Sequence, residues 1–342
     1  MLFLLLMVLG LWWPTSGHAQ NVNCTATMGS PAITADLVNG TGGTAMATLT
    51  YTCKNSSSGL FGSNYYASVC FNVGDGAQGL SHFNPRVMTD AAADALQFQI
   101  YTNAGYTQIW GSIGNAAVPN PYEVIVGPIA KGGGTITGTW TIYASLINGQ
   151  TNVPSGSYQD QFSAAGGHTS ITHAESTNHA SLSLGTCQSF TDTGSFPFAV
   201  TASITKSCNV SATSDMIFAN AASMAINVAG TSSVQVTCSP SVAYDVGLAP
   251  SAANGGNANG GGRMISMTAP ATNTDKVPYQ LYQNLAHSVV WGNTTGANTL
   301  TTANGLAAGT GLPQTYSVYG VVPSANFTPD TYQDTVTVTV TY

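Results

Sequence analysis

Hydroxyl and apolar residues alternate without a break at the end of the chain, from Thr335 to Tyr342. Successive side chains of a strand point to opposite faces, so Val336, Val338, Val340 and Tyr342 lie on one face and the threonines on the other. Thr and Val are β-branched and suit a pleated, half-buried surface. The pattern predicts a closing strand with one face in a core and its backbone edge free for a partner.

The chain also repeats itself weakly, with matching stretches about 180 residues apart. Residues 96–101 (LQFQIY) return as residues 277–282 (VPYQLY), and residues 157–160 (SYQD) return as residues 331–334 (TYQD). Arg86 matches Arg263, and the matches keep their order along the chain. This indicates a duplication. We interpret the two arginines as structural, bonding carbonyls or an acid at a strand start.

Each copy consists of short runs rich in Thr, Val, Ile and Tyr, separated by Gly, Asn, Pro and Ser. Such runs are typical of an antiparallel β-sandwich, and no convincing amphipathic helix accompanies them. The sequence therefore predicts an all-β protein with a first domain over residues 20–165 and a second over residues 196–342. Residues 166–195, rich in Ser, Thr, Gly and His, are interpreted as a linker.

Residues 1–19 are predicted to be a secretory signal peptide. Residues 2–13 form an apolar run, Pro14 ends it, and small residues occupy positions 17 and 19. The run is too short to span a bilayer, and no later stretch approaches that length. We therefore expect an exported protein without a membrane span.

Charged residues make up 6% of the chain, against about 25% in an average protein. The net charge is −7, and the sequence contains no basic cluster. This composition argues against nucleic acid or anionic lipid as a partner. No nucleophile motif or phosphate-binding loop is present, so we expect neither an enzyme nor a cofactor.

Six cysteines in an exported chain favour disulfides, and none lies in a zinc-binding pattern, so no metal site is predicted. The equivalence of the copies pairs Cys24 with Cys53 and Cys208 with Cys238. Cys70 and Cys187 then pair by default. His168, His173 and His179 are interpreted as solvated histidines of the linker, with a weak metal site as the alternative.

The second copy resembles the spore coat protein U domain, the pilin fold of archaic (Csu-type) chaperone–usher pili. The resemblance covers this copy from end to end and is carried by Val236-x-Cys238, Tyr279-x-Leu281-Tyr282, Trp291-Gly292, Tyr316-x-Val318-Tyr319-Gly320 and the closing Tyr332-x-Asp334-Thr-Val-Thr-Val. It implies two immunoglobulin-like, pilin-type sandwiches in tandem, the C-terminal one incomplete. It also implies donor-strand exchange, in which a partner supplies the missing strand next to Val336, Val338, Val340 and Tyr342.

The implied partners are a periplasmic pilus chaperone, an outer-membrane usher and the next pilin subunit. The first copy departs from the pattern, because it lacks the long Thr-Val run and carries extra residues between Cys53 and Cys70. A diverged first copy before a regular one looks like the two-domain tip adhesin of such a pilus. Only residues 20–23 precede Cys24, too few for a donor strand. We therefore expect a subunit that receives a strand at the pilus tip, at the cell surface.

Residues 196–204 form a second alternating stretch, with Phe196, Phe198, Val200 and Ile204 on one face. Either this segment completes the first copy from within the chain, as an internal donor strand, or it is simply the first strand of the second copy. The sequence leaves both possibilities open.

Several apolar residues of the first copy fall where loops are expected. They are Pro31, Ala32, Ile33, Leu60, Phe61, Ala117, Val118, Leu146, Ile147 and Val153. Several in one domain favour a real apolar patch, which predicts attachment to abiotic or host surfaces and biofilm formation. A polymerising spore-coat or cell-surface structural protein and a carbohydrate-binding adhesin are the alternatives.

Overall fold

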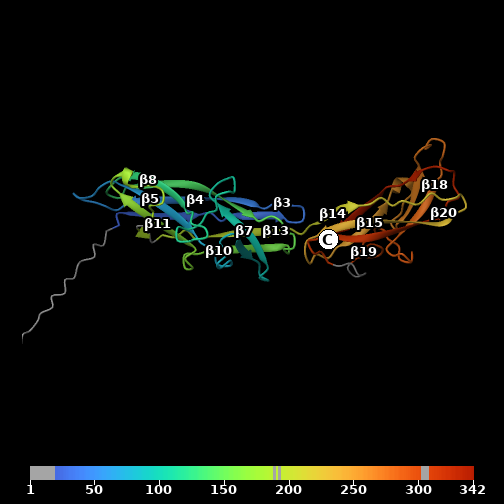
Figure 1. Cartoon of the computed structure of the whole chain (residues 1–342), viewed down its shortest axis with the longest axis horizontal. Helices are drawn as coiled ribbons and strands as arrows, with labels where there is room; N and C mark the ends of the chain where they lie inside the picture. The colour runs from blue at the N-terminus through green and yellow to red at the C-terminus, as the bar shows by residue number, and fades with distance from the viewer. Residues whose placement is uncertain (1–19, 188–189, 192–193, 302–307) are drawn as a thin grey trace, which may run out of the picture.

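The computed structural model describes residues 20–187, 190–191, 194–301 and 308–342; the predicted signal peptide, residues 1–19, lies outside them. Two β units lie end to end in an elongated molecule (Figure 1). We call residues 20–204 the first unit and residues 208–342 the second unit. Nowhere in the described ranges is there a helix with the length and hydropathy to cross a membrane.

Among its described residues, the first unit contains thirteen strands and one short 3-10 helix. They are β1 (Val22–Met28), β2 (Ala32–Asp36), β3 (Thr41–Gly42), β4 (Thr44–Asn55), β5 (Tyr65–Val73), β6 (Arg86–Thr89), β7 (Ala95–Tyr101), β8 (Tyr122–Ile129), β9 (Thr135–Leu146), β10 (Gly156–Phe162), β11 (Thr169–Ser176), η1 (His179–Ser181), β12 (Phe190–Thr191) and β13 (Phe198–Ile204).

The second unit contains nine strands and one 3-10 helix among its described residues. They are β14 (Cys208–Thr213), β15 (Ile226–Cys238), β16 (Asp245–Pro250), η2 (Ala252–Asn254), β17 (Gly261–Ser266), β18 (Lys276–Tyr282), β19 (Leu300–Thr301), β20 (Gln314–Ser324), β21 (Tyr332–Gln333) and β22 (Val336–Thr341).

Each unit is a sandwich of two sheets. The first has a nine-stranded sheet, in the order β1-β4-β9-β7-β6-β10-β13-β2-β3, and a four-stranded sheet, β12-β11-β5-β8. The second has sheets β14-β15-β20-β18-β17-β21 and β19-β16-β22. Among the strands that the structure describes, every pair is antiparallel except β13 with β2. The prediction of two tandem antiparallel β-sandwiches is confirmed.

β4 shows why these sequences form strands around a core. Leu49, Tyr51 and Cys53 alternate with threonines, and the three are buried. Each sandwich has its own apolar core, formed by residues of both of its sheets. The period of two thus decides which face of each strand is covered.

β13 belongs to the first unit, although residues 196–342 were predicted to form the second domain. It pairs antiparallel with β10 over seven residues and parallel with β2. Phe198 and Val200 lie in the first unit's core, where the Phe198 ring stacks on that of Phe162 with centroids 4.6 Å apart. The domain boundary therefore lies after Ile204, because the apolar face of the segment is buried before the second unit begins.

The prediction of a linker over residues 166–195 is wrong. β11 lies in this range and pairs with β5 along eight residues, Thr169 to Ser176. His168 and His173, predicted to be solvated, are buried, and they lie 3.1 Å from Asp75 and 3.6 Å from Glu175. A polar composition resembles a linker, but here the strand carries Thr and His on the face that it buries.

The three disulfides are Cys24–Cys53, Cys208–Cys238 and Cys70–Cys187. Cys24–Cys53 joins directly opposed residues of β1 and β4, and Cys208–Cys238 joins directly opposed residues of β14 and β15. The third ties the segment after η1 to β5. The internal duplication thus predicted the first two pairings, and the third is the pair that was left by default.

Only Thr205, Lys206 and Ser207 connect β13 to β14. Thr205 N donates to Ala35 O at 3.0 Å in the first unit, and the Ser207 hydroxyl donates to Asp36 Oδ1 at 2.5 Å. Ser207 N also donates to the hydroxyl of Ser239 in the second unit. The connection is therefore hydrogen-bonded to both units.

Phe198→Ala is expected to lower the free energy of unfolding of the first unit by about 3–5 kcal/mol, because it empties a buried site that the ring fills. Phe61→Ala is the matched control, since this ring is 98% exposed, and should change stability by less than about 0.5 kcal/mol. Urea unfolding of both variants measures the difference. Equal stabilities would show that β13 does not contribute to this core.

Candidate functional site

A hollow of about 430 Å³ opens in the second unit. Its apolar lining includes Val234, Leu281 and Val318 of the large sheet. Residues 214–216, Phe218, residues 331–334, Val336 and Val338 also line it, so β21 and the start of β22 border the hollow. A hollow with apolar side chains in its lining, next to a sheet edge, is a candidate site for an added strand.

The two units can be compared strand by strand through their buried tryptophans. Trp110 donates from its indole nitrogen to Phe71 O on β5, and Trp291 donates in the same way to Val246 O on β16, both at 2.8 Å. β5 and β16 therefore correspond. Their antiparallel neighbours β11 and β22 correspond as well.

β10 contains the first copy of the repeated sequence Tyr-Gln-Asp, and β21 contains the Tyr-Gln of the second copy, which Asp334 follows. β10 is followed in its sheet by β13 and β2, whereas β21 is the last strand of its sheet. In the part of the second unit that the structure describes, nothing pairs with the outer edge of β21. The hollow thus lies where β13 lies in the first unit.

The apolar face of β22 is only half covered. Val336, Val338 and Val340 are half-buried, and Tyr342 is exposed. The residues of β11 that correspond to Val338 and Val340 are Thr169 and Ile171, which are buried. Of the four residues predicted to contact a donor strand, Val336 and Val338 line the hollow.

Residues 214–225 connect β14 to β15, as β2 and β3 connect β1 to β4, but they contain no strand. Met216 and Phe218 instead extend over Gly230 and Gly320, two paired glycines of β15 and β20. A Cβ atom on Gly320 would lie 2.2 Å from the Met216 sulfur, so the glycines make room for these side chains. The corresponding pair in the first unit is Ala45 on β4 and Ala144 on β9.

The apolar residues predicted to form surface-binding loops do not lie together. Pro31, Ile33, Val118, Leu146 and Val153 are buried, Ile147 is half-buried, and Ala32, Ala117, Leu60 and Phe61 are exposed. The prediction that the first five contact a surface is therefore wrong.

The physical reason is that these side chains belong to the sandwich itself. Ile33 is an inward residue of β2, and Leu146 is the last inward residue of β9. The loop that follows β9 lies at the junction, where a Cβ atom on Gly311 of the second unit would be 1.9 Å from Thr151 O. This loop cannot be part of the far end of the first unit.

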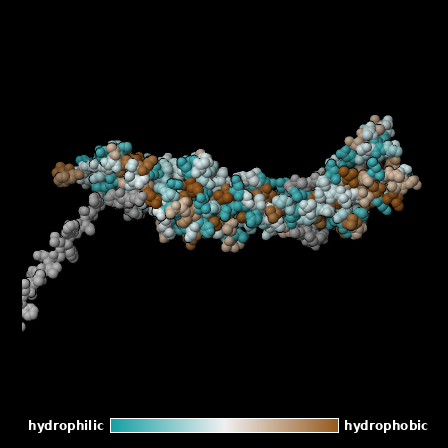
Figure 2. Space-filling view, in the orientation of Figure 1, coloured by the Kyte–Doolittle hydropathy of each residue, from teal (hydrophilic) through white to brown (hydrophobic). Residues whose placement is uncertain are grey.

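Leu60 and Phe61, which were also predicted to bind a surface, are exposed, with exposed fractions of 97% and 98%. Their loop, which we call the finger (residues 56–64), joins β4 to β5 at the end of the first unit opposite the junction (Figure 1). Figure 2 shows hydrophobic surface at this end. Gly59 adopts a φ of 76°, and Gly62 N donates to Gly59 O, so a tight turn presents the two side chains.

A buried asparagine holds the base of the finger. Asn55 donates from Nδ2 to Ser63 O at 2.8 Å and to Ile129 O at 2.9 Å, and its Oδ1 accepts from Ser57 N. The Ser57 hydroxyl donates to Ser63 O as well. These bonds tie both ends of the finger to β8, so the apolar turn stands on a fixed base.

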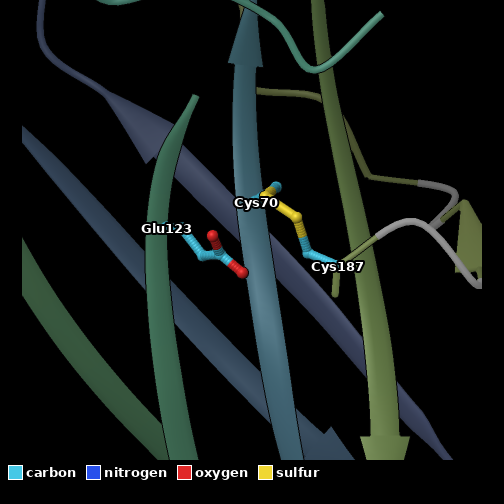
Figure 3. A group of neighbouring side chains, drawn as sticks. All are labelled: Cys70, Glu123 and Cys187. Atoms are coloured by element: carbon cyan, nitrogen blue, oxygen red, sulfur yellow. A yellow bond between two sulfur atoms is a disulfide. The ribbon is translucent and has the colours of Figure 1, made fainter. Parts of the chain in front are cut away.

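Cys70, Glu123 and Cys187 lie close together beside β5 (Figure 3). The two sulfurs are bonded to each other, so neither is a thiolate that could bind a metal. The Glu123 carboxylate accepts hydrogen bonds from the Ser68 hydroxyl and Gly185 N. This group fastens residues 183–187 to the sheet.

The sequence profile of the Spore Coat Protein U domain matches residues 16–165 and residues 195–339. The chain belongs to the Spore Coat Protein U domain family. Its two Spore Coat Protein U domains coincide broadly with the two units, except that strands β11 and β13 extend the first beyond residue 165.

Among curated proteins, Protein U of Myxococcus xanthus is 40% identical over 74 residues. The match covers 21% of this chain and 37% of Protein U, so it spans little more than a third of that relative.

Among solved structures, the matching chain of the CsuC–CsuE chaperone–tip adhesion subunit pre-assembly complex, from archaic chaperone–usher Csu pili of Acinetobacter baumannii, is 16% identical. The TM-score is 0.49, and the match covers 94% of this chain and 100% of that chain. The CupB6 tip adhesin from Pseudomonas aeruginosa is 8% identical, with a TM-score of 0.35 and coverage of 93% and 94%.

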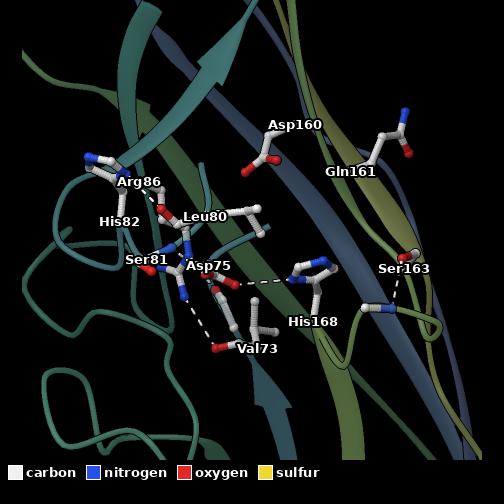
Figure 4. Close-up of polar contacts among 12 residues, drawn as sticks. Val73, Asp75, Leu80, Ser81, His82, Arg86, Asp160, Gln161, Ser163 and His168 are labelled. Carbon is white, nitrogen blue, oxygen red and sulfur yellow. Dashed lines mark hydrogen bonds and ion pairs between the residues drawn. The ribbon is translucent and has the colours of Figure 1, made fainter. Parts of the chain in front are cut away.

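Arg86 lies fully buried in the first Spore Coat Protein U domain and donates mainly to backbone carbonyls (Figure 4). Its Nε donates to Gly74 O at 2.8 Å, and Nη2 donates to Trp110 O at 2.8 Å and to Val73 O at 3.3 Å. Nη1 donates to the Gln99 side chain. Burial lowers the pKa of Arg86 to about 10, which leaves it charged at neutral pH. The side chain joins the end of β5 to β7 and to the loop that follows β7.

Arg263 has a different position, because the sequence match is one residue out of register. Gly262, and not Arg263, lies opposite Tyr279, just as Arg86 lies opposite Phe98. A shift of one residue moves a side chain to the other face of the strand, so Arg263 is exposed. The Tyr279 hydroxyl occupies the space at Gly262 and donates to Asp334 at 2.7 Å.

Asp160 is the counterpart of Asp334, and β13 buries it. It pairs with Val200, and its Oδ1 accepts from Gln78 N at 2.9 Å. Burial raises the pKa of Asp160 to about 7, although the backbone hydrogen bonds and the charge of Arg86 act to lower it. Asp334, beside the open hollow, is only half-buried.

The raised pKa of Asp160 predicts a specific pH dependence. The folded state holds this proton between pH 3.8 and about 7, where the unfolded state has lost it, so wild-type stability falls as pH rises through this range. Asp160→Asn cannot titrate. The free energy of unfolding of the variant relative to wild type should therefore rise from pH 3.8 to about 7 and stay constant above it. Urea unfolding over this range measures the difference, and a pH-independent difference would contradict the prediction.

Proposed function

We propose that the chain is the tip adhesin of an archaic chaperone–usher pilus, exported through the periplasm and displayed at the cell surface. The observation that carries the proposal is the difference between its two Spore Coat Protein U domains. The first contains β13 next to β10, whereas the second has a hollow at the same place. One domain can fold by itself, and the other needs a strand from another chain.

β13 also indicates what kind of segment the hollow accepts. It points Phe198, Val200, Ala202 and Ile204 into the first core, which is the alternation expected of an inserted strand. We therefore propose that residues 196–204 act as an internal donor strand. A chaperone strand, and then a strand of the next pilin subunit delivered at the usher, would bind beside Val336 and Val338 in the same way.

Attachment is proposed to occur through the finger at the far end of the first unit, and to support biofilm formation. Leu60 and Phe61 are the two apolar side chains of this end that a flat surface could reach first. Burying such side chains contributes roughly 1.5–3 kcal/mol each, and many pili on one cell add avidity. The base held by Asn55 keeps the entropic cost of contact low.

Two aromatic residues of the first unit that could form a platform for a sugar do not favour a carbohydrate-binding adhesin. Trp110 is fully buried, and its ring stacks on Phe196 with centroids 5.8 Å apart. Tyr122 is half-buried, and its ring stacks on Trp140 with centroids 3.8 Å apart. Neither ring presents an open face beside an acid.

Strand capture by the second unit is tested with Val338→Asp. Val338 lines the hollow, and a buried unpaired carboxylate there should reduce co-purification of the full chain with its pilus chaperone at least about tenfold. Thr339→Asp is the matched control, because Thr339 is the next residue of β22 and faces solvent. If co-purification falls equally in both variants, or falls in neither, this hollow is excluded as the capture site.

Attachment is tested with Leu60→Ser together with Phe61→Ser, which removes both apolar side chains without touching a core. Cells with this tip should lose about tenfold or more of their adhesion to polystyrene. The control changes two exposed leucines elsewhere, Leu80→Ser with Leu285→Ser, and should adhere normally. Undiminished adhesion of the finger variant would refute the proposal.

A further inference from the structure

The exposed cations of the first unit lie at the finger. This unit contains three basic residues, Lys54, Arg86 and Lys131. Arg86 is buried on the inside, whereas the two lysines are exposed. Lys54 is next to last in β4, and Lys131 begins the turn between β8 and β9, so both flank the loop that presents Leu60 and Phe61.

The turn that carries Lys131 forms hydrogen bonds with both ends of the finger. Lys131 N donates to Asn64 Oδ1 at 3.1 Å, Gly132 N to Ser57 O at 2.7 Å, and Gly133 N to Asn55 O at 3.0 Å. A Cβ atom on Gly133 would lie 3.8 Å from the Lys54 side chain. Both lysines therefore lie at the base of the apolar turn, although they are far apart in the sequence.

These charges are not neutralised by neighbours. Within the described ranges, the ion pairs are those of His168 and His173, and neither lysine takes part in one. Among the described residues, the acidic Glu175 on β11 lies opposite Ala67, near the start of β5 at this end of the unit. Its carboxylate accepts from Asn21 N, Asn21 Nδ2 and Val22 N at 2.6–3.0 Å, so it is engaged with the start of β1.

An exposed Leu–Phe turn between two lysines has the chemistry of a membrane-interface contact. Leucine and phenylalanine side chains enter the boundary between headgroups and acyl chains, while lysines keep their ammonium groups at the phosphate level. Anionic lipids add attraction for each nearby lysine. An uncharged apolar surface would use the same turn but gain nothing from Lys54 and Lys131.

We propose that the finger binds lipid bilayers that contain anionic lipids, by inserting Leu60 and Phe61 while Lys54 and Lys131 contact the headgroups. This inference rests on the proposed function of the finger and adds the class of surface. It also revises the conclusion drawn from composition. The net charge of −7 describes the whole chain, whereas the fold gathers two of its six basic residues at one end.

The test measures sedimentation of the purified full chain with phosphatidylcholine vesicles and with vesicles of equal parts phosphatidylcholine and phosphatidylglycerol. Binding is expected to the anionic vesicles and to weaken as salt increases. Lys54→Gln with Lys131→Gln should weaken it about 25-fold, about fivefold for each lysine. Lys206→Gln with Lys276→Gln removes two charges of the second half and should leave it unchanged.

Adhesion to polystyrene separates this inference from the proposed function. The Lys54→Gln, Lys131→Gln variant should attach to polystyrene as wild type does, and its unchanged thermal unfolding would show that it is folded. Equal binding of wild type to both kinds of vesicle, or unchanged vesicle binding by this variant, would overturn the inference alone. If the Leu60→Ser, Phe61→Ser variant still attaches to polystyrene, the proposed function itself fails.

Discussion

The pairing of β13 with β10 is the interaction on which the first unit depends. β10 would otherwise end its sheet with an open backbone edge, and the core beneath it would lack Phe198, Val200 and Ile204. A sheet edge that carries apolar neighbours is a place where other chains add strands. In the first unit, β13 of the same chain covers this edge, whereas in the described part of the second unit the corresponding edge of β21 is uncovered. The two copies of one repeated sequence therefore form one closed domain and one open domain.

The duplication in the sequence predicted most of the fold. Alternating Thr and Val residues identified strands such as β22, and equivalent positions paired Cys24 with Cys53 and Cys208 with Cys238. β11 was missed because its inward residues include Thr169 and His173, which a hydrophobicity pattern does not count as core. The register error at Arg263 arose because matching residue types do not reveal which face of a strand they occupy.

The candidate site was harder to predict, for a physical reason. An apolar residue in a turn is either tucked under the sandwich or exposed, and local sequence does not distinguish the two. Leu146 closes the core at the end of β9, whereas Leu60 stands free because Gly59 and Gly62 turn the chain outward. Lys131 and Lys54 reach the base of the same loop because β9 pairs with β4 and β8 pairs with β5, which only the folded chain shows.

The short connection after β13 has a mechanical consequence. Because only three residues separate β13 from β14, a pull between the far end of the first unit and the second unit enters the first sandwich along the axis of β13. The hydrogen bonds that this strand makes to β10 and β2 are then loaded in shear, all of them together, and do not open one after another as in an unzipping hairpin. The strand that closes the core is thus also the one that carries tension through the molecule.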